Sequence, residues 1–182
     1  MNTNTNTTLP KPKIKSKLKM VVIGNNGVGK TSIIQSLCGR HIQQLPHSDT
    51  VEIEMCTIET EHVEVELDVY DINDTKEYDL TLYMKGFHIL LLIVDLSEMN
   101  CLDDVDELFN RYKLFKLFEE ENDIHQVKYL VGNKSFASKF INTNILAYYA
   151  ELYQLEYIDF TSLIHFPSSL ISLIHQYYNI SS

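Results

Sequence analysis

The sequence predicts a single α/β domain in which a mainly parallel sheet is covered by helices on both faces. Continuous apolar segments, typical of strands buried on both faces, alternate with segments whose apolar residues recur at helical spacing. Residues 51–71 instead alternate apolar and acidic side chains, which is typical of an antiparallel strand pair with one buried face. The chain has 182 residues, of which 45% are hydrophobic, and this is enough to build the core of one domain.

Residues 1–17 are rich in Asn, Thr and Lys, and we expect a disordered arm there, ahead of a folded domain at 18–180. An alternation of Lys with apolar residues starts at Lys13 and leads into MVVIG, the end of the first predicted strand. A short helix follows in TSIIQSLCG and is stopped by Gly39. The antiparallel pair at 51–71 comes next.

The second half of the chain continues the alternation of strands and helices. The predicted strands are FHILLLIVDL, VKYLVGNK and residues 155–160. Asp103 and Asp104 can cap a helix after the first of these. One face of that helix is apolar and carries Val105, Leu108, Phe109, Tyr112 and Phe115. Two further helices are predicted at 143–152 and 168–178.

The charge of the chain argues against nucleic-acid binding. The net charge is -10, from 25 acidic and 15 basic side chains, whereas contacts to phosphate backbones need clustered Lys and Arg. Five lysines lie near the N-terminus, at Lys11, Lys13, Lys15, Lys17 and Lys19. The 3 cysteines are too widely spaced for a disulfide framework or a zinc site, so we expect a reducing, cytoplasmic environment.

Residues 24–31, Gly-Asn-Asn-Gly-Val-Gly-Lys-Thr, match the phosphate-binding pattern G-x-x-x-x-G-K-[ST] between a strand and a helix. The glycines let backbone N–H groups wrap phosphates, while Lys30 reaches the outer two phosphates and Thr31 offers a hydroxyl to Mg²⁺. The following helix directs its positive end at the anion. The candidate phosphate-binding residues are Asn26, Gly27, Val28, Gly29, Lys30, Thr31 and Ser32.

With this loop and the motifs after it, the chain resembles a small GTPase of the Ras superfamily, closest to the Rab branch. The nucleotide-binding motifs of that family occur in order as GNNGVGKTS, the threonine of SDTVEIE, the aspartate of YDINDT, VGNKSF and FTSLI. YMKGF, ahead of ILLLIVDLS, resembles the Rab segment Y-Y-R-G-A. The resemblance implies a small G domain of the P-loop NTPase class, with a six-stranded, mostly parallel sheet and one antiparallel strand.

The resemblance also implies a role for each matching residue, with Mg²⁺ and GDP or GTP as cofactors. The implied metal ligands are Thr31, Thr50 and Asp71. The implied catalytic residues are Lys30, Thr50 and Thr75. The implied guanine-binding residues are Asn133, Lys134, Ser162 and Leu163.

Three departures from the family pattern predict weakened chemistry. Where the family has W-D-T-A-G-Q, this chain has Asp74 in place of the glycine and Thr75 in place of the glutamine that orients the attacking water. A carboxylate repels the γ-phosphate, and phosphoryl transfer depends mostly on positioning and electrostatics. Phe136 replaces the aspartate that accepts two hydrogen bonds from guanine. We therefore expect slow hydrolysis and reduced guanine selectivity.

The leading functional hypothesis is a divergent Rab-like GTPase that binds GDP and GTP with Mg²⁺ and hydrolyses GTP very slowly, as a switch in vesicle trafficking. A degenerate G domain acting as a protein-interaction module is the alternative. A small P-loop kinase is a third hypothesis, although such enzymes use several arginines and this chain has only Arg40 and Arg111.

Expected partners are proteins that bind the switch loops and strands 51–71, and no nucleic acid. The acidic ladder in those strands, Glu52, Glu54, Glu64, Glu66 and Asp68, has two interpretations: a docking surface or a solvated strand face. The sequence ends in Tyr178-Asn-Ile-Ser-Ser without a cysteine for prenylation, so we expect no direct membrane anchor in this chain. We expect a cytoplasmic protein, which would reach endomembranes through a C-terminal segment beyond Ser182.

Overall fold

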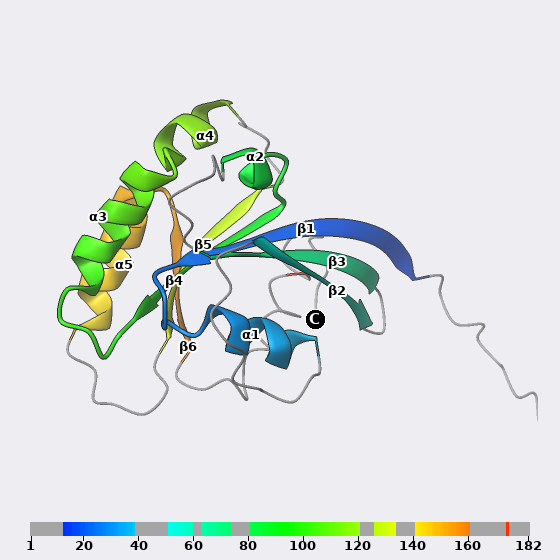
Figure 1. The fold of residues 1–182 in the computed structure, drawn as a ribbon, viewed down its shortest axis with the longest axis horizontal. Helices are drawn as coiled ribbons and strands as arrows, with labels where there is room; N and C mark the ends of the chain where they lie inside the picture. The colour runs from blue at the N-terminus through cyan, green and yellow to red at the C-terminus, as the bar shows by residue number, and fades with distance from the viewer. Residues whose placement is uncertain are drawn as a thin grey trace, which may run out of the picture.

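The computed structural model describes residues 13–38, 51–59, 63–73, 81–120, 126–133, 141–160 and 174. It contains a six-stranded sheet in the order β2-β3-β1-β4-β5-β6 (Figure 1). The strands are β1 (Ile14–Gly24), β2 (Val51–Glu59), β3 (Val63–Ile72), β4 (Ile89–Asp95), β5 (Val127–Asn133) and β6 (Glu156–Phe160). The helices of the described residues are α1 (Lys30–Leu37), α2 (Thr81–Met84), α3 (Cys101–Arg111), α4 (Leu114–Glu120) and α5 (Thr143–Leu152).

The sheet is parallel except for the pairing of β2 with β3. Strand β1 lies between β3 and β4 and is parallel to both, and β4, β5 and β6 continue the parallel arrangement. Strand β2 is antiparallel to β3 and forms one edge. The predicted fold class is therefore confirmed. Because β1, β4 and β5 are parallel neighbours, the loops that follow them meet at one edge of the sheet, where α/β proteins bind their ligands.

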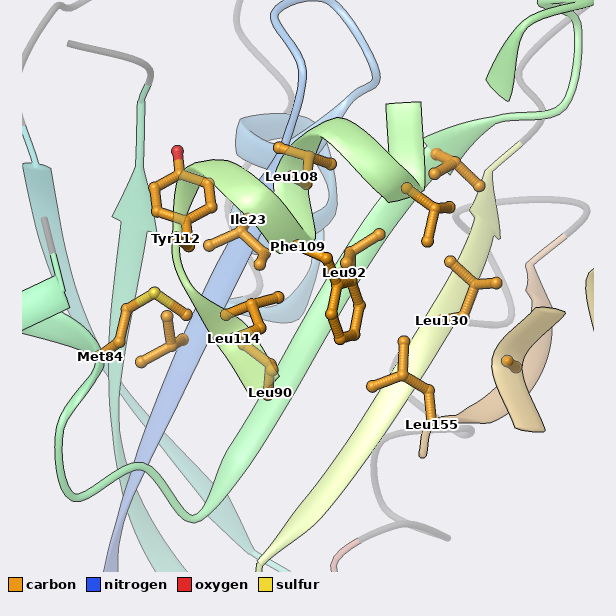
Figure 2. Packing of buried hydrophobic residues seen from close by; sticks show 14 of the residues in the cluster. Ile23, Met84, Leu90, Leu92, Leu108, Phe109, Tyr112, Leu114, Leu130 and Leu155 are labelled. Atoms are coloured by element: carbon orange, nitrogen blue, oxygen red, sulfur yellow. The ribbon is translucent and has the colours of Figure 1, made fainter. Parts of the chain in front are cut away.

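Helices cover both faces of the sheet, as predicted. On one face, α2, α3, α4 and α5 pack on β1, β4 and β5 (Figure 1). Figure 2 shows this layer, in which Leu108 and Phe109 of α3 lie over Ile23, Leu92 and Leu130 of the strands. On the other face, Ile33 and Ile34 of α1 belong to a second apolar layer. The predicted helix at 168–178 lies outside the described residues, apart from the buried Ile174 in this second layer.

Strand β1 begins where the alternation of Lys with apolar residues predicts it, within the segment that was expected to be a disordered arm. It begins at Ile14, so residues 14–17 belong to the sheet, and the boundary expected between residues 17 and 18 is wrong for them. The lysines of this segment form ion pairs with the neighbouring strand β3, which helps to hold it in the sheet. These pairs are Lys15–Glu64 at 2.8 Å and Lys17–Asp68 at 3.0 Å. Such exposed pairs add little stability, so they support this part of the strand rather than the core.

The acidic ladder of residues 51–71 is divided between the two faces of the sheet. In the antiparallel register Glu52 lies opposite Asp71, while Met55 lies opposite Asp68. Neighbouring positions of a strand point to opposite faces, so Glu52 shares its face with Ile58, which packs on the second apolar layer. The acids of β3 lie on the other face, beside the lysines of β1: Glu64, Glu66 and Asp68. The ladder is therefore not one continuous docking surface.

The helix predicted to carry Phe115 ends before that residue. Helix α3 starts at Cys101 after Asn100, so Asp103 and Asp104 lie in its first turn and do not cap it. It ends at Arg111, and Lys113 then takes a left-handed conformation with φ 51°, which starts α4 in a new direction. Phe115 consequently leaves the core face and is 46% exposed, with its ring stacked on Tyr153. Among the described residues, no helix is long and apolar enough to span a membrane.

Candidate functional site

The phosphate-binding pattern forms the loop that joins β1 to α1, at the carboxyl end of a central strand. Gly27 and Gly29 have φ values of 85° and 95°, in the left-handed region that favours glycine. Gly29 is the N-cap of α1, and no side chain caps the helix. The first helical hydrogen bond runs from the Ile33 N–H to the Gly29 carbonyl at 3.0 Å, so the N–H groups of residues 30–32 have no helical acceptor. An uncapped helix start without acidic residues in its first turn is suited to an anion.

The ammonium of Lys30 is held inside this loop. Its Nζ donates hydrogen bonds to the carbonyl oxygens of Gly24 at 2.9 Å and Asn25 at 3.1 Å. Only 4% of the residue is exposed, and a buried charge needs such polar partners. The positive charge is thereby fixed beside the N-terminus of α1, where both attract phosphate.

Thr31, in the first turn of α1, contacts Asp71 near the end of β3. The Thr31 hydroxyl donates to Oδ2 of Asp71 at 2.7 Å, and Oδ1 of this buried carboxylate has no hydrogen-bond partner. Burial raises the pKa of Asp71, against the hydrogen bond from Thr31 and the charge of Lys30, which lower it. Glu52 and Glu54 add to the increase. A hydroxyl and a carboxylate with an unused oxygen are the hard oxygen donors that Mg²⁺ prefers, so these residues fit a magnesium site.

Asn133, the last residue of β5, ties the phosphate loop to a distant part of the chain. Its Nδ2 donates to the Val28 carbonyl at 2.7 Å, and only 5% of the residue is exposed. The backbone carbonyl of Asn133 accepts from the N–H of Leu96 at 2.9 Å, which joins the loops after β4 and β5. A Cβ on Gly29 would lie 2.4 Å from Nδ2 of Asn133, so this contact requires glycine at position 29. The sequence indicated Asn133 for the base pocket only through resemblance and did not indicate its contact with the loop.

Sequence reasoning also missed the proximity of the loop to the first turn of α3. Asp104, in the first turn of α3, lies near enough to Asn25 of the loop for the Asn25 side chain to influence the pKa of its carboxyl. Burial raises the pKa of Asp104, as do the negative charges of Glu107, Asp103 and Glu98, and the nearby Asn25 side chain opposes the increase. Asp103 and Asp104 were evident in the sequence, but they were interpreted only as a cap of the helix that follows.

Comparison with protein families identifies the fold that carries this loop. The model of the Ras family matches residues 19–165, a range that includes the loop, Asp71 and Asn133. The chain belongs to the Ras family. It is a small GTPase of the Ras superfamily, and its described sheet and helices are those of a small G domain. A comparison with curated proteins finds no significant match.

In this Ras-family G domain, the structure brings together one part of the predicted site. The loop residues 26–32, Asp71 and Asn133 gather at the carboxyl edge of the sheet, with Asn26 exposed and Ser32 half-buried. Other predicted site residues lie outside the described residues: Thr50, Thr75, Lys134, Ser162 and Leu163. The same holds for the three substituted positions, Asp74, Thr75 and Phe136.

Proposed function

We propose that this Ras-superfamily protein is a divergent Rab-like GTPase that binds GDP and GTP with Mg²⁺ and hydrolyses GTP very slowly, as a switch in vesicle trafficking. The observation that carries the proposal is the phosphate loop with Lys30 held inside it, beside the uncapped start of α1. The Rab subtype rests on the sequence resemblance, above all on the YMKGF segment.

Nucleotide binding in this proposal uses groups that are already in position. The N–H groups of residues 30–32 and the loop backbone would donate to phosphate oxygens, and Lys30 would contribute its charge. Since the carbonyls of Gly24 and Asn25 already restrain the ammonium, little of its rotational freedom is left to lose on binding. Open space around Gly27 leaves room for phosphates to approach the backbone closely.

Mg²⁺ would be held by Thr31 and Asp71, with Thr50 as the mobile ligand that the resemblance implies. The ion would neutralise charge on the phosphates during the transfer. The Thr31 hydroxyl now donates to Asp71, and to act as a ligand it would turn a lone pair toward the metal. Asp71, with its unpartnered Oδ1, is suited to accept a hydrogen bond from a metal-bound water.

Slow turnover follows from the two residues that replace the glycine and glutamine of the family. By the family pattern, Thr75 would be too short to orient a water as glutamine does, and Asp74 would bring a negative charge near the γ-phosphate. Both changes reduce stabilisation of the transition state, whereas the phosphate loop acts on the bound nucleotide as a whole. Binding is therefore proposed to persist where catalysis is weak.

A surface on strand β2 suits protein partners of the kind this family binds. Ile53 and Met55 are 56% and 68% exposed on this edge strand, on the same face as Tyr70 of β3. Large exposed apolar side chains on an edge strand are typical of protein contacts, because the strand also offers unpaired backbone groups. This observation also favours the second candidate function, an interaction module that does not respond to nucleotide.

Titration of GDP, GTP, ADP and ATP against the purified chain, with and without Mg²⁺, separates these functions. Tight binding of GDP and GTP that Mg²⁺ strengthens supports the proposed GTPase. Binding confined to ADP and ATP supports the kinase hypothesis. Absence of binding for all four nucleotides, in a protein whose circular dichroism shows it folded, refutes the proposal and leaves the interaction module.

A further inference from the structure

Asp71 is a buried carboxylate with one oxygen left without a partner. Only 2% of the residue is exposed. Its Oδ2 accepts from the Thr31 hydroxyl at 2.7 Å, whereas Oδ1 has no hydrogen-bond partner. A buried polar atom without a partner is uncommon in proteins and indicates an ion or a water that belongs beside it. The hard oxygen donors of Asp71 and Thr31 favour a divalent cation.

A second carboxylate lies on the same face of the sheet, directly opposite the first. Glu52 of β2 pairs with Asp71 of β3 in the antiparallel register. Side chains that are opposite one another on such strands share a face, with Cβ atoms about 4.5–5.5 Å apart. Glu52 is half-buried, whereas the next residue, Ile53, is 56% exposed on the other face. Burial raises the pKa of Asp71, and the negative charge of Glu52 adds to the increase.

Helix α1 covers this face and places its first turn against Asp71. Ile34 packs in the same apolar layer as Val69 of β3, and Thr31, one turn earlier in the helix, donates to Asp71. Lys30 adds one ammonium, which the carbonyl oxygens of the phosphate loop hold. Two carboxyl groups therefore lie beside a single basic side chain at this end of α1.

Like charges that lie opposite one another on paired strands destabilise a sheet. A divalent cation between Glu52 and Asp71 would offset that repulsion and would give Oδ1 of Asp71 a partner. Within the described part of the chain, no group of three or more His, Cys, Asp or Glu side chains could hold a metal ion. Mg²⁺ typically takes only one or two carboxylates and keeps several waters, so a pair is sufficient. We propose that Glu52 is the second carboxylate of the cation site, and that Glu52 and Asp71 bind a divalent cation before any nucleotide is present.

This inference rests on the cation site of the proposed function, and it is tested without nucleotide. The full chain, freed of nucleotide and shown to be folded by circular dichroism, is titrated with Mn²⁺, and electron paramagnetic resonance measures the free ion. Mg²⁺ added afterwards should displace the bound Mn²⁺. We expect Glu52→Gln to weaken Mn²⁺ binding about tenfold, because it removes one charged ligand, and Asp71→Asn to weaken it at least as much.

Two matched controls carry the same change of charge. Glu66→Gln alters an exposed acid of β3 on the opposite face from Asp71, and Mn²⁺ affinity should stay within about twofold of wild type. Glu54→Gln alters an acid on the same face as Glu52, but opposite Val69 and two positions further along β2. Its effect should be clearly smaller than that of Glu52→Gln, since the Coulomb energy decreases with distance.

Thermal unfolding gives a second readout with the opposite sign in the two conditions. In EDTA, Glu52→Gln should unfold at a higher temperature than wild type, because the repulsion between the two carboxylates is gone. In millimolar Mn²⁺ or Mg²⁺, wild type should gain more in unfolding temperature than Glu52→Gln, because it binds the ion more tightly. A role of Glu52 in folding alone would not reverse the order in this way.

The inference is overturned if the folded wild type binds no Mn²⁺ at millimolar concentration. It is also overturned if Glu52→Gln binds Mn²⁺ as wild type does, or if Glu66→Gln weakens binding equally. Should Glu52→Gln fail to fold, Glu52→Ala compared with Glu66→Ala replaces it. Binding of Mn²⁺ that depends on Glu52, in a chain that binds no nucleotide, would refute the proposed GTPase and leave the cation site. Tight GDP binding with no effect of Glu52→Gln on Mn²⁺ would do the reverse.

Discussion

Replacement of Gly29 by alanine tests whether the contact between the phosphate loop and β5 is as close as the structure shows. An added Cβ would lie 2.4 Å from Nδ2 of Asn133, well inside normal contact distance, and would displace that amide from the Val28 carbonyl. The loss of this buried hydrogen bond costs about 1–3 kcal/mol, because the carbonyl is left without a partner. The φ of 95° adds about 1–2 kcal/mol of strain for any L-residue with a side chain. Gly29→Ala should therefore lower the free energy of unfolding by about 2–5 kcal/mol in total.

Gly27→Ala is the matched control for this prediction. Its φ is 85°, so alanine meets a similar strain there, but nothing lies within 4 Å of the added Cβ. We expect Gly27→Ala to cost only about 1–2 kcal/mol. The difference between the two variants, about 1–3 kcal/mol, isolates the displacement of Asn133.

Urea unfolding of the nucleotide-free chain, followed by circular dichroism, measures both variants. The test of cause is a double-mutant cycle with Asn133→Ala, which removes the amide that the new methyl group meets. In that background the cost of Gly29→Ala should fall to the cost of Gly27→Ala. Equal costs for the two glycine variants in the wild-type background, or a Gly29→Ala cost that is unchanged when Asn133 is absent, would refute the reasoning.

Three further predictions concern the nucleotide. Lys30→Ala should weaken GDP binding at least about tenfold, because it removes a charge-assisted phosphate contact. Calorimetric titration of the folded variant measures this, and an unchanged affinity would show that the site is elsewhere. Phe136→Asp should raise the preference for GTP over ATP by restoring the acceptor pair for guanine; a wild-type selectivity already equal to that of an ordinary Rab would contradict this. Asp74→Gly with Thr75→Gln should accelerate single-turnover phosphate release by more than the product of the single effects, since both changes act on one water and one phosphate. Hydrolysis by the wild type at about 10⁻⁴ s⁻¹, the intrinsic rate of Ras-type GTPases, would show that these two residues do not impair the reaction.

The sequence predicted the fold and the phosphate loop because both depend on local patterns. Buried strands appear as continuous apolar runs, and the loop has fixed spacing between its glycines and Lys30. The spacing gave no sign of the Asn133 contact with Val28, because these residues are far apart in the sequence and meet only through the strand order. The helix predicted to continue to Phe115 ends earlier because Lys113 takes a left-handed conformation, which apolar periodicity does not reveal.

The acidic strands show again that local patterns do not reveal contacts between strands. Alternation along each strand was evident, but which acids share a face depends on register between strands. The pairing of Met55 with Asp68 places the β3 acids beside the exposed apolar side chains of β2, and the lysines of β1 lie on their other side. The lysines neutralise part of this acidic charge through the ion pairs with Glu64 and Asp68. The apolar pair Ile53 and Met55 is therefore the more distinctive feature of this face for a partner to bind.

In the proposed function, the two groups of site residues would act at different stages of a GTPase cycle. The loop with Lys30 and the Thr31–Asp71 pair would bind phosphates and metal in the ground state, and the described contacts hold these side chains in place. In the same proposal, Thr75 and Asp74 would act where the γ-phosphate is attacked, so their departure from the family pattern would slow hydrolysis without removing the binding site. A G domain of this kind would not reset itself by hydrolysis on a useful timescale. Its state would then be set by nucleotide exchange and by partners that bind one form, and the exposed surface of β2 would have more influence over the switch than the catalytic residues.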